Sequence, residues 1–361
     1  MTPLACEYDM ASDVALLLAR AQVDRQKLQG KCVFVTGATG FFGLWMLSAL
    51  VAIKQSLGSD LRLVALSRNP DRFLAAYPEF GFDRQVEFIG GDVRHFSYGR
   101  KDVTHLVHMA TTNAAETFAG EDQWRKLDLL YSGTQNVLTQ CAGRLESVLM
   151  TSSGVAYGQC MSEPIRESDQ GFLDTTDPRS ALALGKLTAE YLVSTFSEKQ
   201  GYRYSIARCF SFAGPHLPLD LHYAFGNFIS NAVRKQAIVI QGDGMDRRSY
   251  LYIGDAIAWL LRMLLEPRDK IYNVGSEHDV SISDLANRIA QGSGHNLQVS
   301  FMSAMGGEGN FRRPAYLPST ERIRSDYPEL SEWTDLDKTI DNMLAAHHCV
   351  SPKNQQAFMP A

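Results

Sequence analysis

The stretch TGATGFFG, Thr36–Gly43, places glycines at Gly37, Gly40 and Gly43. It follows the short apolar run KCVFV and precedes a helical pattern, FGLWMLSALVAIKQSL. Between a strand and a helix, Gly37 permits a tight turn, Gly40 lets the backbone approach a pyrophosphate, and Gly43 lets the helix pack close to the strand. The helix start adds amide donors and a positive dipole end. The stretch predicts a dinucleotide-binding loop; the alternative is a glycine-rich turn without a ligand.

Apolar runs and helical patterns alternate outward from this loop, which predicts an α/β fold with a doubly wound, Rossmann-type parallel sheet and a smaller C-terminal substrate-binding lobe. The expected strands are Lys31–Gly37, Leu61–Arg68, Val86–Asp92, Val103–Ala110 and Glu146–Ser153. We expect an N-terminal helical extension over residues 1–30, whose helix opens at Ser12 as N-cap candidate and runs to Leu28. A dinucleotide-binding domain over 31–210, a substrate-binding lobe mainly over 211–345 with some segments returning to the first domain, and a tail over 346–361 complete the predicted organisation.

The composition limits the partners. The formal net charge of -5 does not favour nucleic acid or an anionic membrane. The six cysteines are scattered, without zinc spacing, so we expect no metal and free thiols in a reducing compartment. The N-terminus lacks a secretory pattern, and no apolar stretch reaches the roughly 18 residues of a membrane span. We therefore expect a cytoplasmic protein.

The end of the second expected strand bears on the choice of cofactor. It reads LSRNP, with Ser67 and Arg68 and no acidic residue before Asp71. An acid there would bind the ribose hydroxyl of NAD, whereas Arg68 suits the 2'-phosphate of NADP. NADP is therefore favoured over NAD, although a solvated surface arginine would also explain Arg68. Asp92 is placed to accept from the adenine amino group, or else to cap the following turn.

Eight motifs in order, from about Lys31 to about Ile340, resemble those of the extended short-chain dehydrogenase/reductases that act on nucleotide sugars. The pattern DPRS....GK is similar to the branch that holds epimerases, dehydratases and UDP-glucuronate decarboxylases. The motifs are TGATGFFG, GGDVR, GTQNVL, TSSGVAYG, DPRSALALGK, ARCFSFAGP, GDGMDRRSYLYIGD and YNVGS.

The resemblance implies a catalytic group of serine or threonine, tyrosine and lysine. Ser153 takes the first position and Lys186 the last, where the lysine holds the nicotinamide ribose and lowers the tyrosine pKa. Leu182 falls at the tyrosine position, one helical turn from Lys186, and a leucine side chain cannot move a proton. The loop that carries His216, His222 and Tyr223 is expected to supply a replacement acid/base; Tyr191, farther round the helix, is expected in the core or a subunit interface.

The resemblance also implies the binding residues and narrows the reaction. Dehydratases carry an Asp-Glu pair, and decarboxylases a glutamate, where this chain has Gly154 and Val155, so both reactions lose support. The family arginine that grips the sugar-nucleotide diphosphate matches Arg248, whose alternative is an ion pair with an acid such as Asp255. The other substrate-binding residues implied are Tyr157, Ser211 (where the family usually has asparagine) and Asn227. The cofactor-binding residues implied are Gly37, Thr39, Gly40, Phe41, Phe42, Gly43, Arg68, Asp92, Val93, Ala110 and Lys186.

Two classes of function stay open. The first is an NAD(P)-dependent nucleotide-sugar epimerase or ketoreductase with a non-standard acid/base, favoured by Lys186, Ser153 and Arg248. The second is a catalytically inert scaffold that binds cofactor and sugar nucleotide, favoured by Leu182; a dehydratase or decarboxylase is a further alternative. The expected partners are a nucleoside-diphosphate sugar and, by the resemblance, a second copy of the chain in a homodimer through two helices at about Trp124–Cys141 and Ala181–Thr195.

Overall fold

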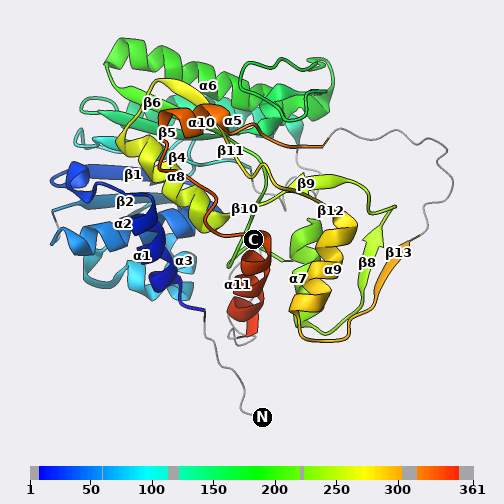
Figure 1. The fold of residues 1–361 in the computed structure, drawn as a ribbon. Coiled ribbons are helices and arrows are strands. Elements are labelled where there is room, and N and C mark those ends of the chain that lie inside the picture. The colour runs from blue at the N-terminus through cyan, green and yellow to red at the C-terminus, as the bar shows by residue number, and fades with distance from the viewer. Residues whose placement is uncertain (1–7, 59, 113–121, 220–222, 303–314, 349–361) are drawn as a thin grey trace.

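A computed structural model describes residues 8–58, 60–112, 122–219, 223–302 and 315–348 of the chain. Its centre is a seven-stranded sheet in the order β11-β6-β5-β4-β1-β2-β3, with every neighbouring pair parallel (Figure 1). The predicted α/β fold is thus confirmed, and the strand order reverses between β1 and β4, where doubly wound sheets bind ligands. The strands are β1 Cys32–Thr36, β2 Arg62–Ser67, β3 Glu87–Gly90, β4 His105–His108, β5 Ser147–Ser153, β6 Arg203–Cys209 and β11 Lys270–Val274.

Helices cover both faces of the sheet, which explains why the central strands are apolar throughout rather than alternating. On one face lie α5 (Gln123–Gln140) and α6 (Ala181–Gln200), whose buried residues pack with β1, β4 and β5. The other face is covered by α1 (Met10–Arg20), α2 (Phe41–Ser56) and α8 (Ile253–Leu265). The sheet therefore lies between two hydrophobic cores.

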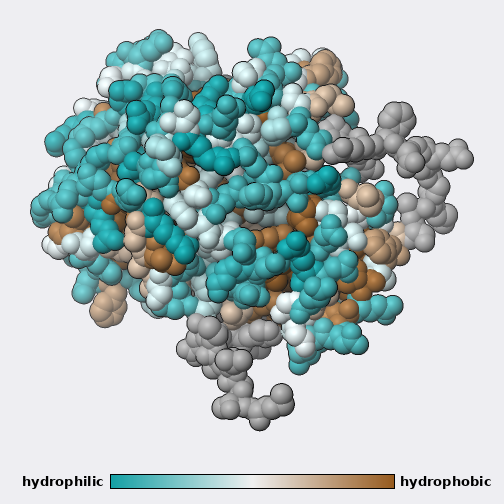
Figure 2. Space-filling view, in the orientation of Figure 1, coloured by the Kyte–Doolittle hydropathy of each residue, from teal (hydrophilic) through white to brown (hydrophobic). Residues whose placement is uncertain are grey.

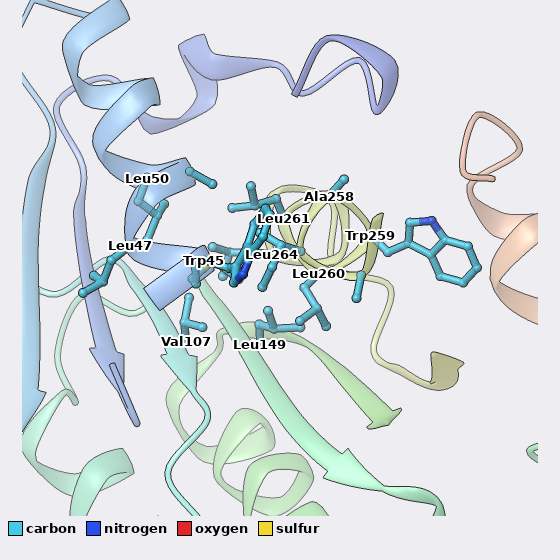
Figure 3. Packing of buried hydrophobic residues seen from close by; sticks show 14 of the residues in the cluster. Trp45, Leu47, Leu50, Val107, Leu149, Ala258, Trp259, Leu260, Leu261 and Leu264 are labelled. Atoms are coloured by element: carbon cyan, nitrogen blue, oxygen red, sulfur yellow. The ribbon is translucent and has the colours of Figure 1, made fainter. Parts of the chain in front are cut away.

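The helix α8 comes from the C-terminal part of the chain but belongs to the larger layer. Figure 3 shows Leu260, Leu261 and Leu264 of α8 beside Trp45 of α2 and near Leu149 of β5. The strand β11 likewise joins the main sheet, at the edge beside β6. Both segments lie within residues 211–345, the range expected to form mainly the smaller lobe.

The smaller lobe has a core of its own, formed by α7 (Ala224–Val233), α9 (Ile282–Gly292) and α11 (Leu336–His348) with β8 (Ile238–Gln241) (Figure 1). Three two-stranded sheets link its parts. They pair β10 with β7, β12 with β9, and β13 with β8. The remaining elements are α3 Pro70–Ala76, β7 Phe212–Ala213, β9 Arg247–Ser249, β10 Leu251–Tyr252, β12 Asp279–Ser281, β13 Val299–Met302 and α10 Glu321–Asp326.

The N-terminal extension differs from the expectation at both ends of its helix. The N-cap is Asp9, whose carboxylate accepts from the amides of Ala11 and Ser12, so the predicted cap at Ser12 is wrong. The helix ends at Arg20, and a separate 3-10 turn follows over Arg25–Leu28. The extension is anchored by Asp13, which accepts hydrogen bonds from Tyr8 and from Tyr252 of β10.

The face of the molecule in Figure 2 is mainly hydrophilic, with separate small hydrophobic patches. Among the described residues, no helix has the length and apolar character needed to cross a membrane. Within the same ranges, no three His, Cys, Asp or Glu side chains gather in a way that suits a metal ion.

Candidate functional site

The glycine loop lies between the carboxyl end of β1 and the start of α2, at the switch point of the sheet. Gly37 has φ of 68°, and a Cβ there would strike the backbone of Met109. A Cβ at Gly43 would collide with the backbone of Ala38, so this glycine permits the close approach of helix and strand. A Cβ at Gly40 would meet only the Gly37 oxygen, at 3.5 Å. The fold itself thus leaves open space at Gly40, where a pyrophosphate would lie.

The amides at the start of α2 are available to an anion. Gly40 is the N-cap residue, and among the described residues no side chain caps this helix. Phe41 and Phe42 form its first turn, and the Phe42 ring packs edge-on against Phe212, with 4.8 Å between ring centroids. An N-terminus that is held in place but not capped by its own chain fits a dinucleotide phosphate.

The residues expected near the adenosine lie around the end of β2. Thr39 and Ser67 approach each other through their hydroxyls, 3.5 Å apart, and Arg68 is exposed beside them. Asp92 caps the turn that follows it, which is its alternative role. Its carboxylate accepts from the Arg94 amide at 2.9 Å and from the Arg94 guanidinium. These bonds lower the pKa of Asp92 to about 2, so its carboxylate stays charged. A contact between Asp92 and adenine stays a prediction.

Val93 and Ala110 complete the expected cofactor wall. Val93 is buried against α5, where a Cβ at Gly133 would strike it. The Ala110 amide donates to the Thr36 hydroxyl at 3.2 Å. This bond holds the chain after β4 beside the end of β1.

Lys186 lies buried on α6, and its Nζ donates to the Thr151 carbonyl of β5 at 2.9 Å. Burial lowers the pKa of this amine to about 8. Ser153 follows at the end of the same strand and pairs in register with Cys209 of β6. The structure therefore brings Lys186 and Ser153, the two retained members of the expected catalytic group, to the carboxyl end of β5.

Leu182 is half-buried on the first turn of α6 and supplies no polar atom. The sequence suggested three substitutes for the missing phenol: His216, His222 and Tyr223. The Nδ1 atom of His216 lies 3.4 Å from the Tyr77 hydroxyl, on the β2 side of the sheet, and burial lowers its pKa to about 4. Tyr223 is 47% exposed at the start of α7, and His222 lies outside the described residues. Tyr191 is 68% exposed, which rules out the core position.

Tyr157 is turned into the protein. Its hydroxyl donates to Asn273 Oδ1 at 2.7 Å, and the Arg208 guanidinium lies 4.4 Å from its ring centroid. Arg208 in turn pairs with the buried Glu190 of α6. Tyr157 therefore has its partners inside the protein, and a contact between Tyr157 and a sugar stays a prediction.

Arg248 lies on β9, half-buried, and its Nη1 donates to the Arg247 carbonyl at 2.9 Å. The alternative ion pair with Asp255 is absent, because that carboxylate accepts from the Trp333 and Thr334 amides instead. None of the described carboxylates forms an ion pair with Arg248, which leaves its guanidinium suited to a phosphate. Ser211 follows the end of β6, and Asn227 lies on α7 of the smaller lobe.

Tyr316 was not found from the sequence. It lies far along the chain, yet its hydroxyl occupies the space where a Cβ of residue 154 would lie. Ser153 lies close enough to this phenol to lower its pKa. The sequence signal was indirect, namely a glycine at a loop position where the resembled dehydratases carry an acid.

The chain is similar in sequence to known proteins. The model of the NAD dependent epimerase/dehydratase family matches residues 33–275. UDP-glucuronic acid decarboxylase 1 of Arabidopsis thaliana is 26% identical over 89% of this chain and 71% of its own length. UDP-glucuronic acid decarboxylase 6 of the same plant is 24% identical over 78% of this chain and 80% of its own.

Two solved structures confirm the fold. UDP-glucuronic acid 4-epimerase from Bacillus cereus, in complex with NAD, superposes with a TM-score of 0.72 at 19% identity, covering 88% of this chain and 98% of that one. UDP-N-acetylglucosamine 4-epimerase from Methanobrevibacter ruminantium gives 0.73 at 20% identity, over 89% and 98%. With its fold, its glycine loop and a family match over most of its length, this chain belongs to the NAD-dependent epimerase/dehydratase family.

Proposed function

We propose that the chain is a cytoplasmic NAD(P)-dependent enzyme that epimerises or reduces a nucleoside-diphosphate sugar. The observation that carries this proposal is the buried amine of Lys186, anchored to Thr151 at the edge of the sheet that also holds Ser153 and the glycine loop. Burying the charged amine of a lysine costs free energy, and a lysine pKa lowered toward neutrality is common at functional sites. Bound there, the cofactor would supply and accept hydride.

The residues that would hold the cofactor are those of the glycine loop, the start of α2 and Lys186. The exposed Arg68 at the end of β2 supports NADP. The NAD in the related Bacillus cereus epimerase supports NAD instead. Titration with both cofactors decides between them.

The sugar nucleotide would lie between the sheet edge and the smaller lobe, with its diphosphate against Arg248. The relatives and neighbours that act on UDP-sugars support a substrate of this class. Decarboxylation, the reaction named in the relatives, is less well supported, since Gly154 and Val155 carry no acid.

A catalytically inert scaffold is the second candidate, and Leu182 favours it. The decisive experiment incubates the purified protein with each cofactor, oxidised and reduced, and with UDP-, GDP-, CDP- and dTDP-sugars. Turnover is followed by the absorbance band of the reduced nicotinamide, by the mass of the products and by proton exchange. A changed sugar establishes the enzyme; tight binding without any change establishes the scaffold.

We further propose a homodimer through α5 and α6. Aromatic side chains are exposed on both helices: Trp124 is 72%, Tyr131 44% and Tyr191 68% exposed. Large exposed aromatic groups are typical of protein interfaces. Sedimentation of the wild type beside a Tyr131→Glu variant tests this proposal.

A further inference from the structure

A phenol from the C-terminal part of the chain reaches the predicted catalytic edge. The segment that carries Tyr316 is held from two sides. The Ile165 amide donates to the Leu317 carbonyl at 2.8 Å, and the Ser319 amide returns a bond to the Ile165 carbonyl at 2.7 Å. Tyr316 itself forms a β-bridge with Arg248 of β9. The backbone at Tyr316 is therefore held by pairing with two separate segments.

The ring of Tyr316 fits the site closely. It packs against Phe210, with 4.6 Å between ring centroids and 34° between ring planes. Its hydroxyl fills the space beside Gly154, where any side chain would collide with it. Gly154 directly follows Ser153, so the absence of a side chain at residue 154 brings this phenol beside the serine.

The charges and polar groups around Tyr316 decide its protonation. Burial raises the pKa of the phenol, and nearby Cys209 and Tyr157 act in the same direction. The Ser153 hydroxyl and the positive charge of Arg248 lower this pKa, but less strongly. The hydroxyl therefore keeps its proton at neutral pH.

We propose that Tyr316 is the proton-transfer residue of this enzyme, replacing the phenol that Leu182 lacks. This inference rests on the proposed function and names the acid/base of the same site. During reduction, a bound reduced nicotinamide would supply a hydride, with its two electrons, to the sugar carbonyl carbon. The carbonyl oxygen takes the proton of the Tyr316 hydroxyl, and the phenolate regains a proton from water. Oxidation of a sugar hydroxyl runs through the reverse transfers.

The first test compares Tyr316→Phe with Tyr191→Phe. Both changes remove one phenolic oxygen, but Tyr191 is 68% exposed in the single chain, on the face of α6 assigned to the dimer. Loss of a positioned acid/base should reduce kcat by about 100-fold or more. The dissociation constant of the sugar nucleotide should change by less than about threefold, as expected for a group that acts mainly in the transition state. Thermal melting checks that both variants fold. Turnover that survives in Tyr316→Phe would overturn the inference while leaving the proposed function intact.

The second test needs no turnover. The protein is labelled with 3-fluorotyrosine at its 14 tyrosines, and the fluorine resonance of Tyr316 is assigned by its loss in Tyr316→Phe. UDP-glucose is then added in the presence of NADP or NAD, with binding followed by calorimetry. We expect the Tyr316 resonance to shift and that of Tyr191 to stay.

The outcomes separate the two proposals. A shift without turnover on any sugar nucleotide would place Tyr316 at the sugar and refute the proposed enzyme. Binding of UDP-glucose without a shift would overturn the role of Tyr316. Failure of every tested sugar nucleotide to bind would refute both.

Discussion

The Nζ atom of Lys186 lies 2.9 Å from the Thr151 carbonyl, so the lysine of α6 is anchored to the strand that ends in Ser153. This bond holds an amine in a buried position at the carboxyl end of the sheet. The cofactor loop, the serine and the phenol of Tyr316 are arranged around that end. Each part of this arrangement leads to a measurable expectation.

The buried Lys186 makes stability depend on pH. Its pKa is about 8 in the folded protein against an ordinary value of 10.5. Between these values the unfolded chain holds the extra proton, so stability rises with pH. Urea unfolding of wild type and Lys186→Met across this range should show the wild type gaining stability relative to the variant. Parallel curves would mean that the amine is not buried.

Substitutions at two glycines of the loop should have different effects, on cofactor binding at Gly40 and on stability at Gly43. Gly40→Ala should weaken cofactor binding by about tenfold or more, a loss of about 1.4 kcal/mol, without lowering the melting temperature. Gly43→Ala should lower the unfolding free energy by about 1–3 kcal/mol, since its Cβ would collide with Ala38. Calorimetry and thermal melting measure both. Equal cofactor affinity in Gly40→Ala and wild type would contradict a pyrophosphate at this loop.

The buried ion pair between Arg208 and Glu190 should contribute strongly to stability. Arg208 Nη2 and Glu190 Oε2 are 2.7 Å apart and buried. Glu190→Gln leaves the guanidinium without its charge partner and should cost about 3–5 kcal/mol. Arg288→Gln, which breaks an exposed pair with Asp337, should cost no more than about 1 kcal/mol. Denaturant unfolding compares them, and similar small losses would refute the structural role of Glu190.

Arg248 should bind the diphosphate through its planar fork. Arg248→Lys keeps the charge but loses paired hydrogen bonds, so UDP should bind about tenfold more weakly or worse. The matched control is Arg247→Lys, because Arg247 pairs with Asp279 of the neighbouring strand. Calorimetric titration with UDP measures both variants. Equal weakening in the two would assign the effect to the strand and not to Arg248.

A phenol placed at residue 182 should compensate for the loss of Tyr316. Leu182 lies one turn from Lys186 on the same helix face. In the Tyr316→Phe background, Leu182→Tyr should raise kcat by at least about tenfold, within the range of acid/base contributions. If Leu182→Tyr creates activity in an otherwise inert wild type, the natural protein is a scaffold.

The glycine loop and the apolar strands could be predicted because they depend on local spacing. The runs at Leu61–Arg68 and Glu146–Ser153 became β2 and β5. The cap of the first helix was misplaced at Ser12, because Asp9 lies just upstream with an equally suitable side chain. The resemblance, which rests on continuous motifs, implied Ser153 and Lys186 as catalytic residues, and that role stays a prediction.

Tyr316 could not be predicted in the same way. Its segment is irregular, and its position depends on pairing with Ile165 and Arg248, which are distant in the sequence. Such contacts leave no periodic pattern. The phenol of Tyr316 explains why residue 154 has no side chain, and the sequence alone does not show that the two are neighbours.

The most direct test of the central claim is a calorimetric titration of the wild-type protein with NAD and with NADP. The account predicts saturable binding of at least one of them to one site per chain, lost in part in Gly40→Ala. If neither dinucleotide binds the folded protein, the glycine loop holds no pyrophosphate, and the proposed enzyme and the role of Tyr316 are both refuted.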